Sequence, residues 1–254
     1  MNNHLIIGSG HAARFVIQLM REVLPFVSIS VVSRNKNQAL RKLADLQEIN
    51  ILTDEDELPL ADMLWLAVPD ERIADTFQKY KMLATKGVCH LSGATSLKEI
   101  TDTDASPIVI WPVASLSLPY TLSKISLVIE CSDDHFFLHT LQEQRLNIFK
   151  TTYENRIKMH MLAVAANNFV HHLHTLIEEE LKSQNLSKDF LMPLIEQTYY
   201  NILHDNLKNL QTGPARRADV ATIRQHESII KTPALKNLYQ SITNSILNFY
   251  AIEL

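Results

Sequence analysis

Residues 4–20 read HLIIGSGHAARFVIQLM, and this stretch decides the fold expected for the N-terminal half of the chain. The apolar residues 5–7 lead into Gly8-Ser9-Gly10, and apolar side chains then recur at helical spacing from His11 onward. This pattern predicts a strand, a tight glycine turn and a helix. Such a turn aims backbone N–H groups and the positive end of a helix dipole at an anion.

The same turn matches the GxGxxA pattern of dinucleotide-binding proteins. Gly8 would make the turn, Gly10 would let a pyrophosphate approach, and Ala13 would let helix and strand pack closely. The chain holds only five glycines, so this spacing is informative, although an ordinary strand-to-helix turn is the alternative. The predicted cofactor-binding residues of the turn are Gly8, Ser9, Gly10, His11, Ala12 and Ala13.

The composition of the 254-residue chain excludes several classes of protein. Its 46% hydrophobic and 20% charged residues are typical of a globular protein long enough for two domains. A net charge of −4 gives no basic field for nucleic acid, and no apolar run approaches the roughly 18 residues that span a bilayer. We therefore expect neither a nucleic-acid partner nor a membrane partner.

Neither the cysteines nor the histidine-rich stretch HHLHTLIE at 171–178 predicts a metal site. Cys89 and Cys131 lie far from CxxC spacing, and adjacent histidines point apart on a helix. Because two isolated cysteines suggest no disulfide framework, we expect a reducing, cytoplasmic location.

Strand and helix signals alternate through the first half of the chain. Predicted strands follow the first at 27–32, 49–52, 63–68, 88–91, 108–111 and 125–130, and predicted helices include 38–46, 96–100 and 133–146. This alternation predicts an α/β fold, with a doubly wound, mainly parallel sheet in a Rossmann dinucleotide-binding domain over residues 1–150.

From about Thr151 the strand signals stop. Long helical patterns cover residues 154–182, 190–210, 218–230 and 234–252. They predict an all-helical domain over residues 151–254.

The end of the second predicted strand indicates which dinucleotide binds. NAD-binding proteins place an acid there for the ribose 2′-OH, whereas NADP-binding proteins use arginine for the 2′-phosphate. Here the chain reads Ser33-Arg34-Asn35-Lys36, with no acid before Asp45. Ser33 and Arg34 therefore favour NADP, and the alternative is that Arg34 and Lys36 merely form a solvated turn.

Two further strand ends carry predicted cofactor contacts. In an open α/β sheet, ligands lie at the carboxyl ends of the strands. We therefore expect Ala67, Val68 and Pro69 beside the cofactor, and Ser92 and Gly93 near its nicotinamide end. For Ser92 a simple turn cap is the alternative.

The first helical segment is unusually polar within MHMLAVAANNFVHHLH, residues 159–174. At 100° per residue, Asn167 and His171 each fall within about 20° of His160, and Asn168 lies farther round the helix. Buried imidazole and amide groups need partners, and a substrate is one candidate. Hydrogen bonds to neighbouring helices are the alternative.

A second polar group lies in QTGPARRAD, residues 211–219. Gly213-Pro214 ends one predicted helix, and Asp219 lies at the opening of the next. A threonine, two arginines and an aspartate exceed what a turn requires, although Arg217 and Asp219 would also pair with each other and cap the helix.

The segments LAVPDERI, HLSGATSL, 159–168 and TGPARRAD, in this order behind GSGHAA, carry a family resemblance. The chain resembles bacterial Rossmann-like proteins with a C-terminal helical domain of unknown function, relatives of pyrroline-5-carboxylate reductase and the β-hydroxyacid dehydrogenases. The resemblance covers nearly the whole chain. The chain departs from the family pattern where Trp111, Met159 and Ala218 replace a histidine, a tyrosine and a glycine, and where Asn167 precedes Asn168 in place of a serine.

The resemblance implies an NADP(H)-dependent oxidoreductase that forms a homodimer through its helical domain, with the site between the Rossmann and helical domains. The expected reaction is hydride transfer to or from a small carbonyl or imine substrate. His160 is the expected general acid, Asn168 and Ser92 would orient the substrate, and Arg217, held by Asp219, would bind a carboxylate. Because of the departures, the alternative is a non-catalytic dimer that senses NADP or a metabolite.

Overall fold

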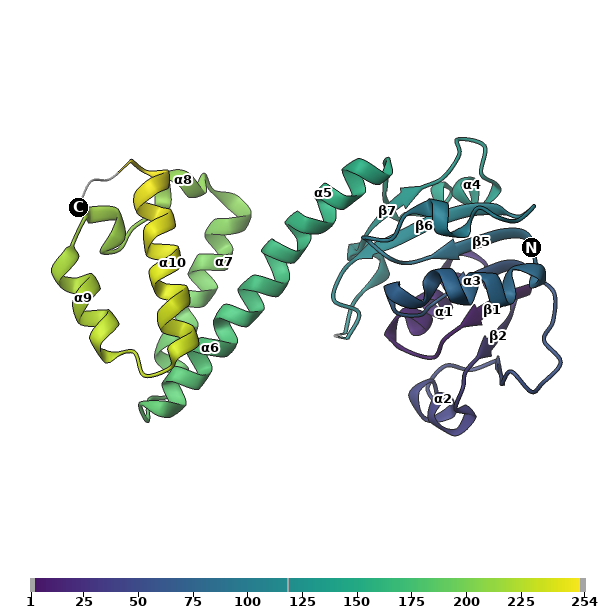
Figure 1. The fold of residues 1–254 in the computed structure, drawn as a ribbon, viewed down its shortest axis with the longest axis horizontal. Helices are drawn as coiled ribbons and strands as arrows, with labels where there is room; N and C mark the ends of the chain where they lie inside the picture. The colour runs from purple at the N-terminus through teal and green to yellow at the C-terminus, as the bar shows by residue number, and fades with distance from the viewer. Residues whose placement is uncertain (1–2, 118, 252–254) are drawn as a thin grey trace. The chain divides into compact units, whose positions relative to one another are not determined.

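The structure is a computed structural model that describes residues 3–117 and 119–251. The chain divides into two compact units, Met1–Ala163 and Val164–Leu254 (Figure 1). The last strand ends at Lys150, and the helix that follows it, α5 (Tyr153–Ala163), belongs to the first unit by its contacts.

One eight-stranded sheet runs through the described part of the first unit, in the order β3-β2-β1-β4-β5-β6-β7-β8. All neighbouring strands are parallel except β6 and β7, which are antiparallel. The predicted α/β fold class is therefore confirmed. The strands are β1 (Asn3–Ile7), β2 (Ser28–Val32), β3 (Ile49–Leu52), β4 (Ala61–Leu66), β5 (Ala84–His90), β6 (Ser106–Val113), β7 (Ser126–Glu130) and β8 (Asn147–Lys150).

Helices pack on both faces of this sheet. The larger core joins one face to α1 (His11–Val23), α2 (Lys36–Lys42) and α4 (Phe136–Gln142). The smaller core joins the other face to α3 (Ile73–Tyr80) and to the 3₁₀ helix η3 (Leu97–Ile100). Because central strands such as β1, β4 and β6 are covered on both sides, they appear in the sequence as continuous apolar runs rather than as alternating patterns.

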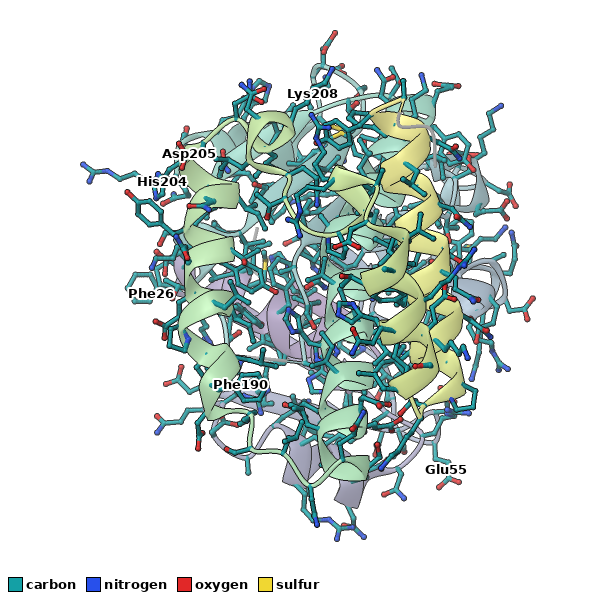
Figure 2. The ribbon with its side chains drawn as sticks, turned by 90° about the vertical axis from the view of Figure 1, so that its left-hand side faces the viewer. Phe26, Glu55, Phe190, His204, Asp205 and Lys208 are labelled. Atoms are coloured by element: carbon teal, nitrogen blue, oxygen red, sulfur yellow. The ribbon has the colours of Figure 1, made fainter. Side chains whose placement is uncertain are left out.

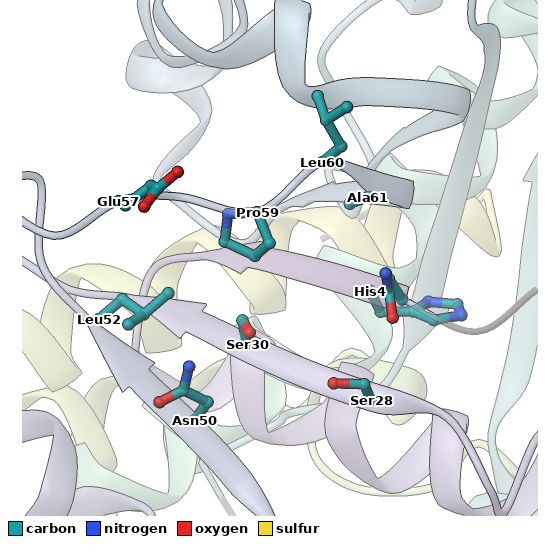
Figure 3. Close-up of a pocket in the computed structure, with 10 residues that line it drawn as sticks. His4, Ser28, Ser30, Asn50, Leu52, Glu57, Pro59, Leu60 and Ala61 are labelled. Atoms are coloured by element: carbon teal, nitrogen blue, oxygen red, sulfur yellow. The ribbon is translucent and has the colours of Figure 1, made fainter.

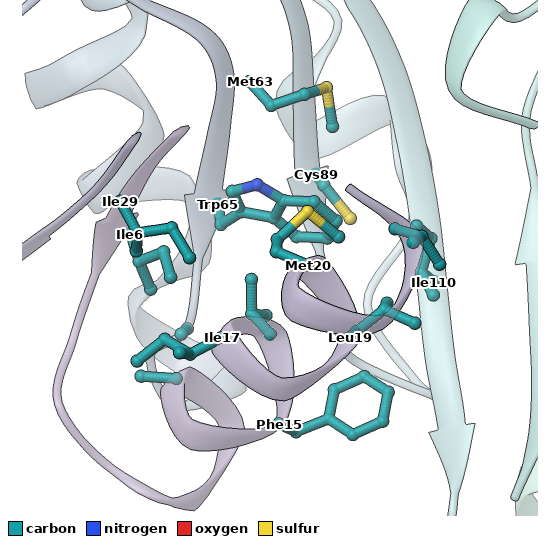
Figure 4. Close-up of a cluster of buried hydrophobic side chains, with 14 of the residues drawn as sticks. Ile6, Phe15, Ile17, Leu19, Met20, Ile29, Met63, Trp65, Cys89 and Ile110 are labelled. Carbon is teal, nitrogen blue, oxygen red and sulfur yellow. The ribbon is translucent and has the colours of Figure 1, made fainter. Parts of the chain in front are cut away.

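Helix α1 supplies much of the larger core (Figure 4). Phe15, Ile17 and Met20 on α1 are fully buried together with Trp65 of β4. Each such side chain contributes about 1.5–3 kcal/mol by leaving water, so the packing fixes α1 firmly against the sheet. The start of α1 is thereby held where β1 ends.

A loop rather than a helix connects β3 to β4. The sheet face beneath this loop holds a pocket of about 310 Å³ lined by polar groups, including Ser28, Ser30 and Asn50 (Figure 3). The serines of β2 alternate with Ile29 and Val31, which belong to the larger core on the opposite face. The two-residue period of a strand therefore places the hydroxyl groups on the part of the opposite face that this loop, rather than a helix, covers.

The second unit is helical, as predicted. Its α-helices are α6 (Val170–Ser183), α7 (Met192–His204), α8 (Leu207–Leu210), α9 (Val220–Ile229) and α10 (Pro233–Phe249). The end of the last predicted helix, at residue 252, lies outside the described residues. In the part of the chain that the structure describes, no helix is long and apolar enough to cross a membrane.

Several predicted element bounds are corrected by the structure. The first predicted helix of the C-terminal half contains a π-helical segment, Val164–Phe169, between α5 and α6. The predicted helix 190–210 is divided into α7 and α8, with extended backbone at Asp205. The predicted helix 133–146 is shorter, and the edge strand β8 follows it.

A buried histidine forms part of the larger core. Nδ1 of His4 accepts a hydrogen bond of 3.0 Å from the indole Nε1 of Trp65, and the two rings stack with centroids 6.2 Å apart. Burial lowers the pKa of His4 from 6.5 to about 4. The folded protein therefore binds fewer protons than the unfolded chain between these two pH values.

We expect this histidine to make the first unit less stable in acid. Its contribution to the free energy of unfolding is complete above about pH 6.5 and falls by about 2 kcal/mol by pH 5. His4→Gln keeps an acceptor for Trp65 but cannot titrate, so chemical denaturation should show a smaller loss of stability between these pH values. The exposed His139→Gln is the matched control and should keep the wild-type slope. Equal slopes for all three proteins would contradict this account.

Candidate functional site

The glycine turn lies where the strand order reverses, between β1 and β4. Gly8 has φ +116°, and a Cβ added to it would lie 2.2 Å from the carbonyl oxygen of Ala67. The Gly8 N–H donates to Val32 O at 2.9 Å, and the Ala67 N–H donates to Ile7 O at 2.9 Å. Only glycine fits here, because both the backbone angle and the close approach exclude a side chain. This is the position at which open α/β sheets bind ligands.

The start of α1 suits an anion. Its N-cap is Gly10, and no side chain caps the helix. A Cβ added to Gly10 would meet nothing within 4 Å, so the space above it is open. Ala13, by contrast, is fully buried where helix and strand meet. Free N–H groups, a helix dipole and open space together fit a dinucleotide pyrophosphate.

A cleft of about 830 Å³ extends from this turn across the ends of β2 and β4 to α3. It brings together eight of the predicted cofactor-binding residues: Gly8, Ser9, Gly10, Ser33, Arg34, Ala67, Val68 and Pro69. Among the described residues, the cleft lining does not include the other predicted positions His11, Ala12, Ala13, Ser92 and Gly93. For those five, cofactor contact stays a prediction.

The end of β2 places a hydroxyl and a guanidinium at the cleft. Ser33 Oγ lies 3.0 Å from Ser9 Oγ, which links this strand end to the glycine turn. Arg34 is exposed and lines the cleft, and Asn35 caps α2 by accepting from the Gln38 N–H at 2.9 Å. Arg34 is thus presented on a fixed turn with its guanidinium accessible.

An aspartate that the sequence analysis did not identify also lines the cleft. Asp54 follows β3, and its carboxylate accepts from Lys79 Nζ at 2.7 Å and from the Tyr80 hydroxyl. These hydrogen bonds lower the pKa of Asp54 despite its partial burial. Lys79 thus balances the charge of Asp54, and among the described residues Arg34 forms no ion pair within 4.0 Å.

The loop after β5 contains Ser92, and its hydroxyl is fully used within the protein. Ser92 Oγ donates to Asp70 Oδ2 at 2.7 Å and accepts from the N–H groups of Ala94 at 3.0 Å and Thr95 at 2.8 Å. A hydroxyl has one donor and two acceptor sites, so these contacts saturate it. The geometry fits the turn-cap alternative, and substrate contact by Ser92 stays a prediction.

His160 packs onto the same loop. A Cβ added to Gly93 would lie 2.3 Å from His160 Cδ2 and 2.9 Å from Trp111 Cε2. The rings of His160 and Trp111 meet edge to face with centroids 5.3 Å apart. Gly93 is therefore required for this contact, and Trp111 occupies one side of the imidazole that we expect to act as the acid.

The other histidine of this region, His90, is a structural acceptor. It is fully buried, and its Nδ1 accepts from the Ser92 N–H at 3.2 Å. Burial, with a smaller effect of Arg156, lowers the pKa of His90 to about 3. His90 is therefore neutral at physiological pH and holds the loop rather than supplying a proton.

The remaining predicted site residues lie in the second unit. Asp219 caps α9: its carboxylate accepts from Thr222 N at 3.0 Å and from Thr222 Oγ1 at 2.7 Å. Ala218, where the family pattern has glycine, is left-handed with φ +56°, which costs a non-glycine residue about 1–2 kcal/mol. Arg217 is exposed. For Asn168, Arg217 and Asp219, a catalytic role stays a prediction.

The expected alignment of His160, Asn167 and His171 needs correction. It assumed an unbroken α-helix of 100° per residue, whereas a π-helix turns less per residue. Asn167, Asn168 and His171 are also exposed in the described chain rather than buried.

Within the described residues, no three His, Cys, Asp or Glu side chains gather in an arrangement that could hold a metal ion.

Comparisons with known proteins agree with this architecture. Residues 132–246 match a family described as a domain of unknown function, DUF2520. A candidate NADP oxidoreductase from Bacteroides fragilis is similar in structure over 97% of this chain and 98% of its own, with a TM-score of 0.84 and 26% sequence identity. No curated protein sequence gives a significant match.

More distant structures share the fold. A 1-pyrroline-5-carboxylate reductase from Streptococcus pyogenes aligns over 97% of this chain and 98% of its own, with a TM-score of 0.61 and 13% identity. A semialdehyde dehydrogenase NAD-binding protein from Cupriavidus necator, in complex with NAD, aligns over 98% of this chain and 99% of its own, with a TM-score of 0.56 and 16% identity. The chain therefore has the fold of NAD(P)-dependent dehydrogenases and reductases, with a DUF2520 region at its C-terminal side.

Proposed function

We propose that this protein is an NADP(H)-dependent oxidoreductase that transfers a hydride to or from a small carbonyl or imine substrate. The observation that carries the proposal is the cleft at the switch point of the sheet, where the glycine turn, the uncapped start of α1 and Arg34 lie together. The structural similarity to NAD(P)-dependent reductases supports the same class of chemistry.

In this proposal different residues of the cleft bind different parts of the dinucleotide. The N–H groups at the start of α1 bind the pyrophosphate, and Ser33 and Arg34 bind the 2′-phosphate. Lys79 keeps Asp54 from repelling that phosphate, because the two side chains form an ion pair of 2.7 Å. When bound, NADPH supplies the hydride.

Reduction of a carbonyl or imine also needs a proton, and we propose His160 as its donor. His160 is half-buried and packs against Gly93 and Trp111, so its ring orientation is defined. An imidazole side chain can both donate a proton and take one up, as a general acid requires.

We expect the protein to bind NADPH more tightly than NADH. Arg34→Asp should weaken NADPH binding about 100-fold by replacing a phosphate-binding cation with an anion, and should leave NADH binding nearly unchanged. Gly10→Ala should fold normally, because its Cβ meets open space, yet should weaken both cofactors by about tenfold or more. Titrations followed by tryptophan fluorescence would measure these affinities.

Arg41→Asp is the matched control for the charge change. Arg41 lies on α2, is exposed, and bonds the carbonyl oxygen of Asn37 on its own helix. It should bind NADPH like the wild type. If Arg34→Asp did the same, or NADH bound as well as NADPH, the assignment of NADP would fail.

A second candidate function is a non-catalytic sensor of NADP or a metabolite. It is favoured by the large Trp111 ring against His160, where the family pattern has a histidine, and by the saturated hydroxyl of Ser92. Both features reduce the polar groups that a substrate could meet near this loop.

Turnover separates the two candidates. Oxidation of NADPH across a panel of imines and keto acids should identify a substrate, and His160→Gln should then lower kcat about 10²-fold or more, because a general acid typically contributes that much. Tight NADPH binding without turnover on the panel would support the sensor. Full activity in His160→Gln would remove His160 from the mechanism.

We also propose that the helical unit forms a homodimer. None of the described residues of α7 is buried, although several of its side chains are large and apolar. Leu194, Tyr200 and Leu203 are 59%, 62% and 76% exposed. Figure 2 shows this helix with its side chains, with Phe190 near its beginning and His204 at its end. Apolar patches of this kind usually mark a protein interface.

The dimer should dissociate when charges are placed on α7. We expect the wild-type protein to sediment as a dimer and the double variant Leu194→Glu with Leu203→Glu to sediment as a folded monomer, because two buried carboxylates disfavour the interface. Phe26→Glu changes a residue of the first unit that is 98% exposed, and this control should remain a dimer. A monomeric wild-type protein would refute the proposal.

A further inference from the structure

A fully buried arginine lies beside the predicted site and has no role in the proposed function so far. Arg156 on α5 has no exposed surface, and it pairs with Glu130 at the end of β7 through Nε at 3.1 Å and Nη2 at 2.8 Å. Its other bonds go to the loop after β5: Nη1 donates to Ser92 O at 2.7 Å, and Nη2 donates to Thr95 O at 2.7 Å.

These contacts use the geometry that distinguishes arginine from lysine. The planar guanidinium reaches one carboxylate and two carbonyl oxygens at once, which a single ammonium group could not do at these positions. The ring of Tyr153, one turn earlier on α5, lies over the guanidinium at 5.4 Å. The buried charge is thus compensated on several sides, as a buried cation requires.

The same loop meets α5 a second time, one turn later. His160 follows Arg156 by four residues, so both side chains lie on one face of the helix. His160 contacts the loop at Gly93, between the two carbonyl groups that Arg156 binds. Loop 92–95 is therefore held by Arg156 and contacted by His160 from the same helix face.

We propose that Arg156 is a positioning residue of the site: it clamps loop 92–95 to α5 so that Gly93 and Trp111 hold the His160 ring in a fixed orientation. The inference rests on the proposed function, because the role of His160 as proton donor belongs to it. Arg156 acts through His160 and the loop, and it needs no contact with substrate or cofactor.

The proposal accounts for two features of the loop together. The Ser92 hydroxyl caps the N–H groups of Ala94 and Thr95, while Arg156 binds the carbonyl oxygens of Ser92 and Thr95. Donors and acceptors of the loop backbone are thus satisfied from two sides. Such a loop has little freedom, which is what a proton donor resting on it requires.

Two measurements that need neither substrate nor cofactor test the clamp. The first is amide hydrogen exchange at Ala94 and Thr95, which should become at least about tenfold faster in Arg156→Met because the loop loses its clamp. The second is the fluorescence of Trp111, which the protonated imidazole of His160 should quench. This quenching is measured as the decrease in tryptophan fluorescence on acidification that the wild type shows and His160→Gln does not. Arg156→Met should lose most of this quenching.

Two further variants make the result specific. Arg156→Lys keeps the positive charge but not the planar guanidinium that binds several acceptors at once. Its Trp111 quenching and its amide exchange rates should therefore lie between those of the wild type and Arg156→Met. If Arg156→Met does not fold, Arg156→Lys alone tests the clamp. Lys158→Met changes an exposed residue of the same helix and should match the wild type in both measurements. NADPH binding should be unchanged in Lys158→Met.

The proposal is overturned if the folded Arg156 variants keep wild-type exchange and wild-type quenching, or if Lys158→Met loses both equally. Failure of the proposed function would look different. A wild-type protein that binds no NADPH would contradict the cofactor assignment, while exchange and quenching would still report on the clamp.

Discussion

The close approach of Gly8 to the carbonyl group of Ala67 is the constraint on which the first unit depends. The two backbones meet where β1 and β4 lie side by side, and no Cβ fits between them. The turn that results leads directly into α1, whose apolar face is buried against the sheet. Core packing therefore fixes the direction in which the free N–H groups of α1 point, and the anion-binding geometry follows from it.

Much of this unit could be predicted from the sequence because its central strands are buried on both faces. Such strands appear as apolar runs, and the glycine pattern identifies the first turn. The edge strand β8, Asn147–Lys150, was missed because it is short and has no buried residue. In the helical unit, periodicity assumes a regular α-helix, so it could not reveal the π-helical segment at Val164–Phe169.

The candidate site was predictable only where its residues belong to a local motif. Gly8, Gly10 and Arg34 follow strand ends, and they line one cleft. Asp54 and Arg156 could not be found in this way, because their partners are distant in sequence: Asp54 meets Tyr80 across 26 positions, and Arg156 meets Thr95 across 61. Their roles depend on tertiary contacts that no spacing rule encodes, and the saturation of Ser92 by Asp70 is hidden for the same reason.

The loop that replaces a helix between β3 and β4 has an evolutionary consequence. It carries Asp54 into the cleft and Asp56 to within 3.9 Å of Lys36, yet it contributes little to either core. Loops of this kind accept substitutions and changes of length that a packed crossover helix would not tolerate. Substitutions in this loop can therefore change the charge around the cleft while the sheet stays the same, so the ligand preference of the cleft can change without a change of fold.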